Sequence, residues 1–93
     1  MSKKTFTRLE VAETVSRALE QLGFTWCPED GEHTHLFDDL GLDSLDGFDM
    51  VLTLEEMFDV SSADENFART FTMRSVIETA CEILREDGRF RGE

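Results

Sequence analysis

The chain has 93 residues, a length typical of one small domain, and a formal net charge of −12 at pH 7. This charge practically excludes nucleic acid as a partner, because phosphate binding needs basic residues, and it favours a basic protein surface. No apolar run reaches the roughly 18 residues of a membrane span, and no signal region follows the N-terminal lysines. Cys27 and Cys81 are too few for a disulfide framework, so we expect free thiols and a cytoplasmic protein.

A first helix is predicted over about residues 8 to 22. Thr7 and Glu10 have the spacing of a capping box at its start. The apolar residues that follow recur at helical spacing: Leu9, Ala12, Val15, Leu19 and Leu22. Gly23 suits the left-handed conformation that often ends a helix, so we place the end of this helix there.

Residues 24 to 42 are predicted to form a long, mostly irregular connection. Pro28 and Gly31 interrupt it, and no apolar periodicity persists along it. A loop of this length needs apolar anchors, and the candidates are Trp26, Leu36, Phe37 and Leu40. Because the loop is long, we expect the next helix to run roughly parallel or slanted to the first one, instead of folding straight back.

A second helix is predicted over residues 44 to about 59. Asp43 is a good N-cap, and Asp46 stands at the position that completes a capping-box-like pair. One apolar line along this helix contains Leu45, Val51, Leu54 and Phe58, and a neighbouring line contains Phe48 and Leu52. Ser44 is therefore predicted to project from the first turn into solvent. The helix dipole and the free backbone N–H groups would favour a phosphate ester there.

The C-terminal third predicts two further helices. Asp64 can cap a short helix that runs to about Arg69, and Thr72 can cap a longer one that ends near Glu86. The apolar stripe of the longer helix contains Met73, Val76, Ile77, Ala80, Ile83 and Leu84. Residues 89 to 91 are expected to form a frayed tail. With no strand pattern anywhere, the predicted fold class is all-α, a small four-helix bundle of three main helices and one short helix.

The sequence around Ser44 resembles the core motif of acyl carrier proteins. The matching features begin with Leu-Phe-Asp-Asp-Leu-Gly over residues 36 to 41, followed by Asp43-Ser44-Leu45. A helix that ends in Leu-Glu-Glu-Met-Phe-Asp and a Thr-capped last helix complete the resemblance, which covers roughly residues 36 to 86. It implies a four-helix bundle of the acyl-carrier-protein type.

The resemblance also implies a function. A phosphopantetheinyl transferase would move 4′-phosphopantetheine from coenzyme A onto Ser44, with Asp43 and Leu45 completing the attachment site. The chain would form a single domain over residues 1 to 93, with an ordered core over about residues 6 to 87. It would not be an enzyme, because the working thiol belongs to the cofactor. It would carry acyl groups as thioesters between enzymes of fatty-acid, polyketide or specialised lipid biosynthesis.

The second helix is also the expected docking surface for partner enzymes. In the carrier family, the positions that match Phe48 and Leu52 face outward and meet partner enzymes. The alternative for this chain is that both residues belong to the core. The acidic residues expected around them are Asp43, Asp49, Glu55 and Glu56. We favour the docking interpretation, with a monomeric carrier whose partners, the transferase and enzymes that transfer or modify acyl groups, have basic docking surfaces.

The same residues admit other interpretations. A calcium loop that begins at Asp38 would place leucines where ligands are required, and Cys27, His33 and His35 match no standard zinc spacing, so no metal site is predicted. Two alternatives stay open: an aminoacyl or peptidyl carrier, and an acidic helical interaction module whose serine is never modified. Gly47 stands inside the predicted second helix, where it either allows close approach of the transferase or the arm, or merely loosens the first turn.

Overall fold

The computed structural model of this protein describes residues 4–60 and 72–91. In these residues the chain forms three α-helices, one short 3-10 turn and no strand. The elements are α1 (Arg8–Gln21), η1 (Pro28–Asp30), α2 (Ser44–Phe58) and α4 (Met73–Glu86). The predicted all-α fold is confirmed, and the arrangement agrees with a helical bundle of the acyl-carrier type. The short helix predicted between Asp64 and about Arg69 lies outside the described residues.

The helices begin at the caps that the sequence predicts. Thr7 accepts a hydrogen bond at its hydroxyl from the backbone N–H of Glu10 (3.2 Å), and the Glu10 carboxylate accepts one from the N–H of Thr7 (2.9 Å). At the start of α4, the Thr72 hydroxyl accepts from the N–H of Ser75 (3.2 Å). These bonds satisfy backbone donors that have no partner inside the helix, which explains why the helix starts could be predicted locally.

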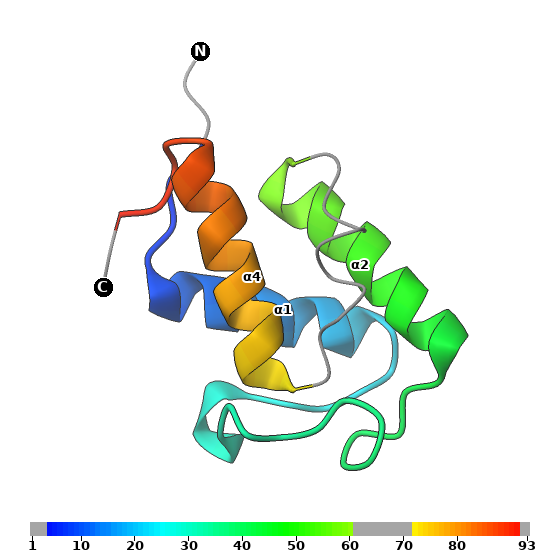
Figure 1. The fold of residues 1–93 in the computed structure, drawn as a ribbon. Helices are drawn as coiled ribbons and strands as arrows, with labels where there is room; N and C mark the ends of the chain where they lie inside the picture. The colour runs from blue at the N-terminus through cyan, green and yellow to red at the C-terminus, as the bar shows by residue number, and fades with distance from the viewer. Residues whose placement is uncertain (1–3, 61–71, 92–93) are drawn as a thin grey trace.

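Helix α1 packs against both α2 and α4, and Figure 1 shows it crossing the other two at a slant. The end of α2 returns toward the beginning of α1, because the rings of Phe58 and Phe6 meet edge-on with 5.1 Å between their centroids. Helix α2 therefore runs back toward the start of α1, but at a slant: the parallel direction is wrong, whereas the slanted arrangement agrees with Figure 1. The long loop does not return the chain to the N-terminal end of α1 before α2 begins. Instead, the loop passes along the N-terminus of α4.

Side chains of all three helices and of the loop form one apolar core. Its helical members are Val11, Ala12, Val15, Ala18, Leu19, Met50, Val51, Leu54, Phe58, Met73, Val76, Ile77, Ala80, Cys81 and Leu84. Trp26 and Leu36 anchor the loop in this core as predicted, and Leu40 packs partly against it. The prediction for Phe37 is wrong, because its side chain is exposed and the unpredicted Leu42 is buried in its place.

Leu9 is a second residue whose predicted position is wrong. The helical spacing predicts it on the apolar stripe of the first helix, but its side chain is exposed to solvent in α1. At 100° per residue, Leu9 lies about 120° around the helix axis from Val15, which is fully buried. Spacing by three residues drifts around a helix, so the first member of a long series can leave the buried face.

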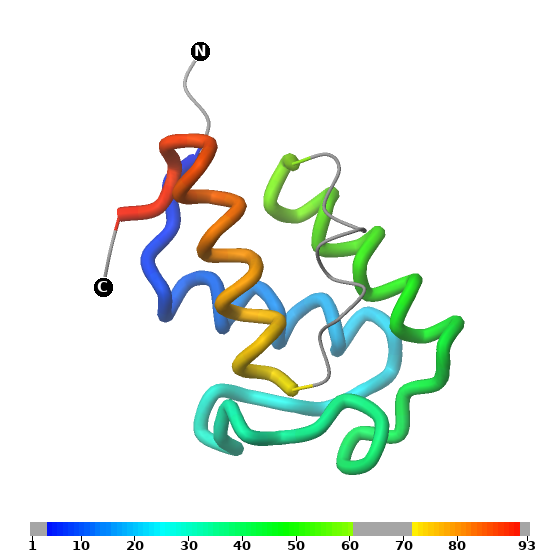
Figure 2. Tube along the Cα trace, viewed as in Figure 1, coloured from blue at the N-terminus to red at the C-terminus, as the bar shows by residue number. Residues whose placement is uncertain are grey.

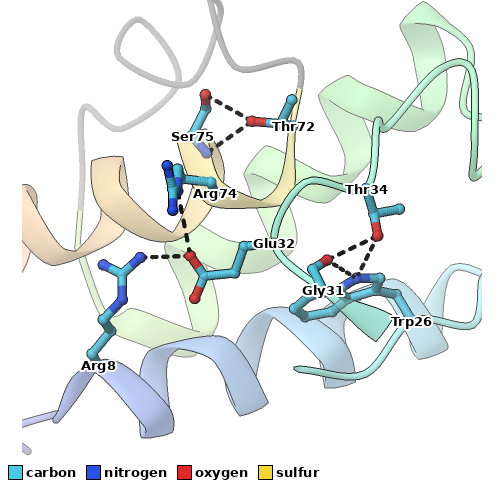
Figure 3. A network of polar contacts seen from close by, with 8 residues as sticks. All are labelled: Arg8, Trp26, Gly31, Glu32, Thr34, Thr72, Arg74 and Ser75. Atoms are coloured by element: carbon cyan, nitrogen blue, oxygen red, sulfur yellow. Dashed lines mark hydrogen bonds and ion pairs between the residues drawn. The ribbon is translucent and has the colours of Figure 1, made fainter. Parts of the chain in front are cut away.

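Backbone carbonyls of the loop satisfy the first N–H groups of α4. Met73 donates to the carbonyl of Thr34 (2.9 Å), and Arg74 donates to the carbonyl of Glu32 (2.7 Å). The Glu32 carboxylate also lies 2.7 Å from the guanidinium of Arg8 and 3.9 Å from that of Arg74, so it links α1 and α4 through the loop (Figure 3). These contacts give a physical reason for the path of the connection.

The Trp26 indole holds the loop in shape from inside. Its N–H lies 3.1 Å from the carbonyl of Gly31 and 3.3 Å from the hydroxyl of Thr34, as Figure 3 shows. The Thr34 hydroxyl in turn donates to the Gly31 carbonyl (2.8 Å). The indole ring is buried while its one polar atom is bonded, which is the usual requirement for a buried tryptophan.

The segment after α4 is not the frayed tail that the sequence predicted. Phe6 donates to the carbonyl of Arg89 and receives a bond at its own carbonyl from Arg91, each at 2.8 Å. Figure 2 shows this segment beside the residues that precede α1. The Arg89 side chain is buried and donates to Asp87 (2.8 Å) and to the carbonyl of Asp59 at the end of α2 (3.1 Å). This pairing is between distant parts of the chain, so no local pattern revealed it.

Candidate functional site

A capping box fixes the backbone at the start of α2. The Asp43 carboxylate accepts from the N–H of Asp46 (2.8 Å), and the Asp46 carboxylate accepts from the N–H of Asp43 (3.1 Å). Asp43 has an extended backbone, as an N-cap residue should, and Ser44 is the first helical residue. Both carboxylates are therefore held against the backbone on either side of Ser44.

The turn before α2 is also firmly placed. Gly41 adopts a positive φ of +81°, which costs a residue without a Cβ little. The next residue, Leu42, is buried, and its N–H donates to the carbonyl of Leu36 (3.1 Å). One end of the turn is thus tied to the core, and the other is closed by the cap of α2.

Ser44 stands exposed at this first turn, as predicted. Within the described part of the chain, its hydroxyl has no hydrogen-bond partner. The N–H groups of Ser44 and Leu45 belong to the first turn of α2, where no intrahelical acceptor exists. An accessible hydroxyl therefore lies beside free backbone donors and the positive end of the helix dipole. This environment fits a phosphate diester, since both features favour negative charge.

Three large apolar side chains on α2 point away from the core. Leu45, Phe48 and Leu52 are 71%, 55% and 43% exposed. At 100° per residue they fall within a sector of about 60° around the helix axis, so they form one apolar row. The outward orientation predicted for Phe48 and Leu52 is confirmed, which excludes the alternative that both belong to the core.

The position predicted for Leu45 is wrong. The helical spacing predicts one apolar line that joins Leu45 to Val51, Leu54 and Phe58. Leu45 lies about 120° around the axis from Val51, however, and it is the most exposed large apolar side chain of residues 4–60 and 72–91. The buried face of α2 includes Met50 in its place. An angular plot of the helix, instead of a count of spacings, would have separated the two faces.

Acidic residues border the apolar row. Asp49 and Glu56 are exposed and lie on one side of it, and Glu55 is half-buried on the other side. Asp43 stands exposed at the N-terminal end, although its carboxylate is engaged in the cap. No lysine or arginine occurs in the sequence between Arg17 and Arg69. The exposed face of α2 is chemically suited to an apolar protein surface bordered by basic residues.

The histidines and cysteines do not form a metal site in the described residues, which contain no group of three or more potential ligands. The Nδ1 atom of His35 accepts from the N–H groups of Phe37 and Asp38 (3.2 Å each), so it supports a turn. Cys27 and Cys81 are free thiols. Burial raises the pKa of the Cys81 thiol, and this residue belongs to the core.

No helix in the described ranges is both long enough and apolar enough to span a bilayer. The described residues therefore show a small helical domain in which α2 is capped, its first serine is exposed and its apolar row faces solvent.

The family model for the phosphopantetheine attachment site matches residues 10–80, which is more than half of the chain. The chain belongs to this family, and it is a carrier domain with a covalently attached 4′-phosphopantetheine. Such a domain interacts with a phosphopantetheinyl transferase and with enzymes that handle the carried group. Carrier domains of this kind typically do no catalysis themselves, because the reactive thiol lies on the cofactor.

Proposed function

We propose that Ser44 is the phosphopantetheine attachment site and that the protein is an acyl carrier. The observation that carries this proposal is the exposed, unbonded Ser44 hydroxyl at the first residue of α2, inside the range that matches the family. Asp43 and Leu45 flank it, one as the cap and the other as an exposed apolar contact. The protein itself is not an enzyme in this proposal.

The chain contributes position and electrostatics at this site. The capping box fixes the backbone around Ser44, so the hydroxyl is already in position when the transferase binds. Free N–H groups and the helix dipole favour the phosphate diester that forms there, and they offset part of the repulsion from the Asp43 and Asp46 carboxylates. The arm, once attached, supplies the thiol that carries the cargo as a thioester.

An apolar crevice supports an acyl cargo over an aminoacyl one. It lies between the end of α2 and α4, and its lining residues are Phe58, Val60, Ala80, Ile83 and Leu84. The crevice is too narrow for a water molecule in this structure. Widening it for an alkyl chain would bury apolar carbon at a gain of about 0.8 kcal/mol per methylene, whereas a charged amino group would lose hydration there.

Partner enzymes dock, in this proposal, on the exposed face of α2. The row of Leu45, Phe48 and Leu52 supplies the apolar centre, and Asp49 and Glu56 attract a basic surface around it. The carrier acts as a monomer with one such face. The two free thiols favour a reducing compartment, so we place the protein in the cytoplasm.

Intact-mass analysis after incubation with coenzyme A and a broad-specificity phosphopantetheinyl transferase tests the attachment site. The wild-type chain should gain one phosphopantetheine group, and Ser44→Ala should gain none. Ser75→Ala is the matched control, because Ser75 also stands in the first turn of a helix, and it should be modified like the wild type.

A wild-type chain that is never modified would support the alternative of an unmodified acidic interaction module. Modification of Ser44→Ala would show that another residue is the attachment site. The mass of the thioester isolated from cells would then separate acyl from aminoacyl or peptidyl cargo.

A further inference from the structure

A second candidate binding feature lies away from α2, where α1 meets the long loop. It is a cavity of about 170 Å³, and its lining residues are Ser16, Glu20, Phe24, Thr25, Trp26 and Cys27. None of these residues belongs to α2, to the crevice beside α4 or to the Ser44 turn. The attachment chemistry therefore does not account for it.

Fixed contacts hold the walls of this cavity. The Ser16 hydroxyl donates to the carbonyl of Trp26 (2.6 Å), which ties the loop to α1. The N–H of Phe24 donates to the carbonyl of Leu19 (2.9 Å), and the Trp26 ring is buried in the core. Because both sides are anchored, the cavity exists before any ligand arrives.

The charge around the cavity is negative. The Glu20 carboxylate lines it and has no hydrogen bond or ion pair within residues 4–60 and 72–91. On the opposite wall, hydrogen bonding to Glu29, together with partial burial and the Asp30 carboxylate, raises the pKa of the Cys27 thiol. Arg17, the nearest basic residue in the sequence, forms no ion pair in the described part of the chain and does not line the cavity.

We propose that this cavity receives an arginine or lysine side chain of a partner protein. The Glu20 carboxylate would bind the charged group, and the Phe24 ring would pack against the alkyl stem or the cation. Its volume corresponds to about six waters at roughly 30 Å³ each, which suits one long side chain and is too small for a folded element. The surrounding acidic charge selects a basic side chain over an acidic or neutral one.

This contact would act together with docking on α2 but would not depend on it. A partner that engages both surfaces gains from the second contact without a second encounter in solution. The proposal therefore assigns a role to the residue 24–31 part of the connection.

The test uses the unmodified full chain labelled with 15N and two blocked tripeptides, Ala-Arg-Ala and Ala-citrulline-Ala. Citrulline has nearly the shape of arginine without its charge, so it isolates the electrostatic contribution. We expect the arginine peptide to shift the Trp26 indole signal and the amide signals of Thr25 and Cys27 in a saturable way. The citrulline peptide should bind at least about threefold more weakly, the size of one exposed ion pair.

Two variants sharpen the result. Glu20→Gln should weaken binding of the arginine peptide by about threefold, whereas Glu13→Gln should leave it unchanged, because Glu13 is exposed on the same helix but does not line the cavity. An unchanged amide spectrum in the absence of peptide confirms that each variant is folded.

Equal losses in both variants, or shifts that are largest on α2, would show diffuse attraction to an acidic chain and would overturn the proposal. Binding of free n-butylguanidinium without binding of the arginine peptide would identify a small-molecule site instead, and would overturn it too. Neither result depends on modification of Ser44, so failure here is distinguishable from failure of the proposed carrier function.

Discussion

Replacing Gly47 by alanine should stabilise the protein. Gly47 lies inside α2, its φ is not in the left-handed region, and a Cβ built on it meets no atom within 4 Å. Alanine therefore fits without strain and gains the full difference in helix propensity, about 0.5–1 kcal/mol in the free energy of unfolding. For a domain of this size, such a gain raises the melting temperature by roughly 2–8 °C.

Gly41→Ala is the matched control, because an added Cβ there also meets no atom within 4 Å. Gly41, however, has a φ of +81°, where a side chain is strained. We expect a loss of about 1–2 kcal/mol in the free energy of unfolding. Urea titrations of the two variants and the wild type, followed by circular dichroism, should give changes of opposite sign.

Destabilisation by Gly47→Ala would refute this reasoning, because nothing in the described residues opposes the added methyl group. The same variant also decides between the two interpretations of Gly47, close approach of the transferase or the arm and a loosened first turn. If the transferase modifies Gly47→Ala as fast as the wild type, the glycine only loosens the first turns of α2. If modification slows while stability rises, the open space beside Gly47 is needed for close approach of the transferase or the arm.

Two further predictions concern the exposed face of α2 and the tail. Leu52→Ala should change the free energy of unfolding by less than about 0.5 kcal/mol and still slow the transferase, whereas the buried Leu54→Ala should cost about 2–5 kcal/mol. Asp49→Lys should slow modification most at low salt, and no effect there would remove α2 as the docking face. Arg89→Ala should cost about 2–4 kcal/mol in a urea titration, since it removes buried hydrogen bonds from a charged donor, against less than about 1 kcal/mol for the exposed Arg91→Ala. Equal losses for the two arginine variants would contradict a structural role for Arg89.

The features that sequence analysis predicted correctly depend on residues close together in the chain. The caps at Thr7, Asp43 and Thr72 each use a side chain and an N–H group three residues later, so the sequence is enough to place them. The exposure of Ser44 follows directly from the cap before it. For the same reason, the predicted helix starts are more accurate than the predicted buried faces.

Leu9 and Leu45 were placed on the wrong face within their own helices, but the other wrong predictions concern contacts between distant parts of the chain. The tail pairs with Phe6 across more than eighty residues, and the buried Arg89 reaches the end of α2. The choice of Leu42 over Phe37 as a loop anchor depends on where the core surface lies, which spacing does not reveal. The direction of α2 depends on the path of the loop along α4. In these long-range cases, packing and not the neighbouring residues decides which groups meet.

The two ends of α2 are both fixed, which supports the proposal that its exposed face is the docking surface. The N-terminal end is fixed by the Asp43 cap and by the buried Leu42, and the C-terminal end is fixed by Phe58 against Phe6 and by the bond from Arg89. Its buried face packs against α1. A helix held in this way stays in place even though its apolar row is in solvent, because burial of that row is not needed to hold it. Docking then needs little rearrangement of the backbone, so burial of the row can contribute to affinity with little cost of ordering.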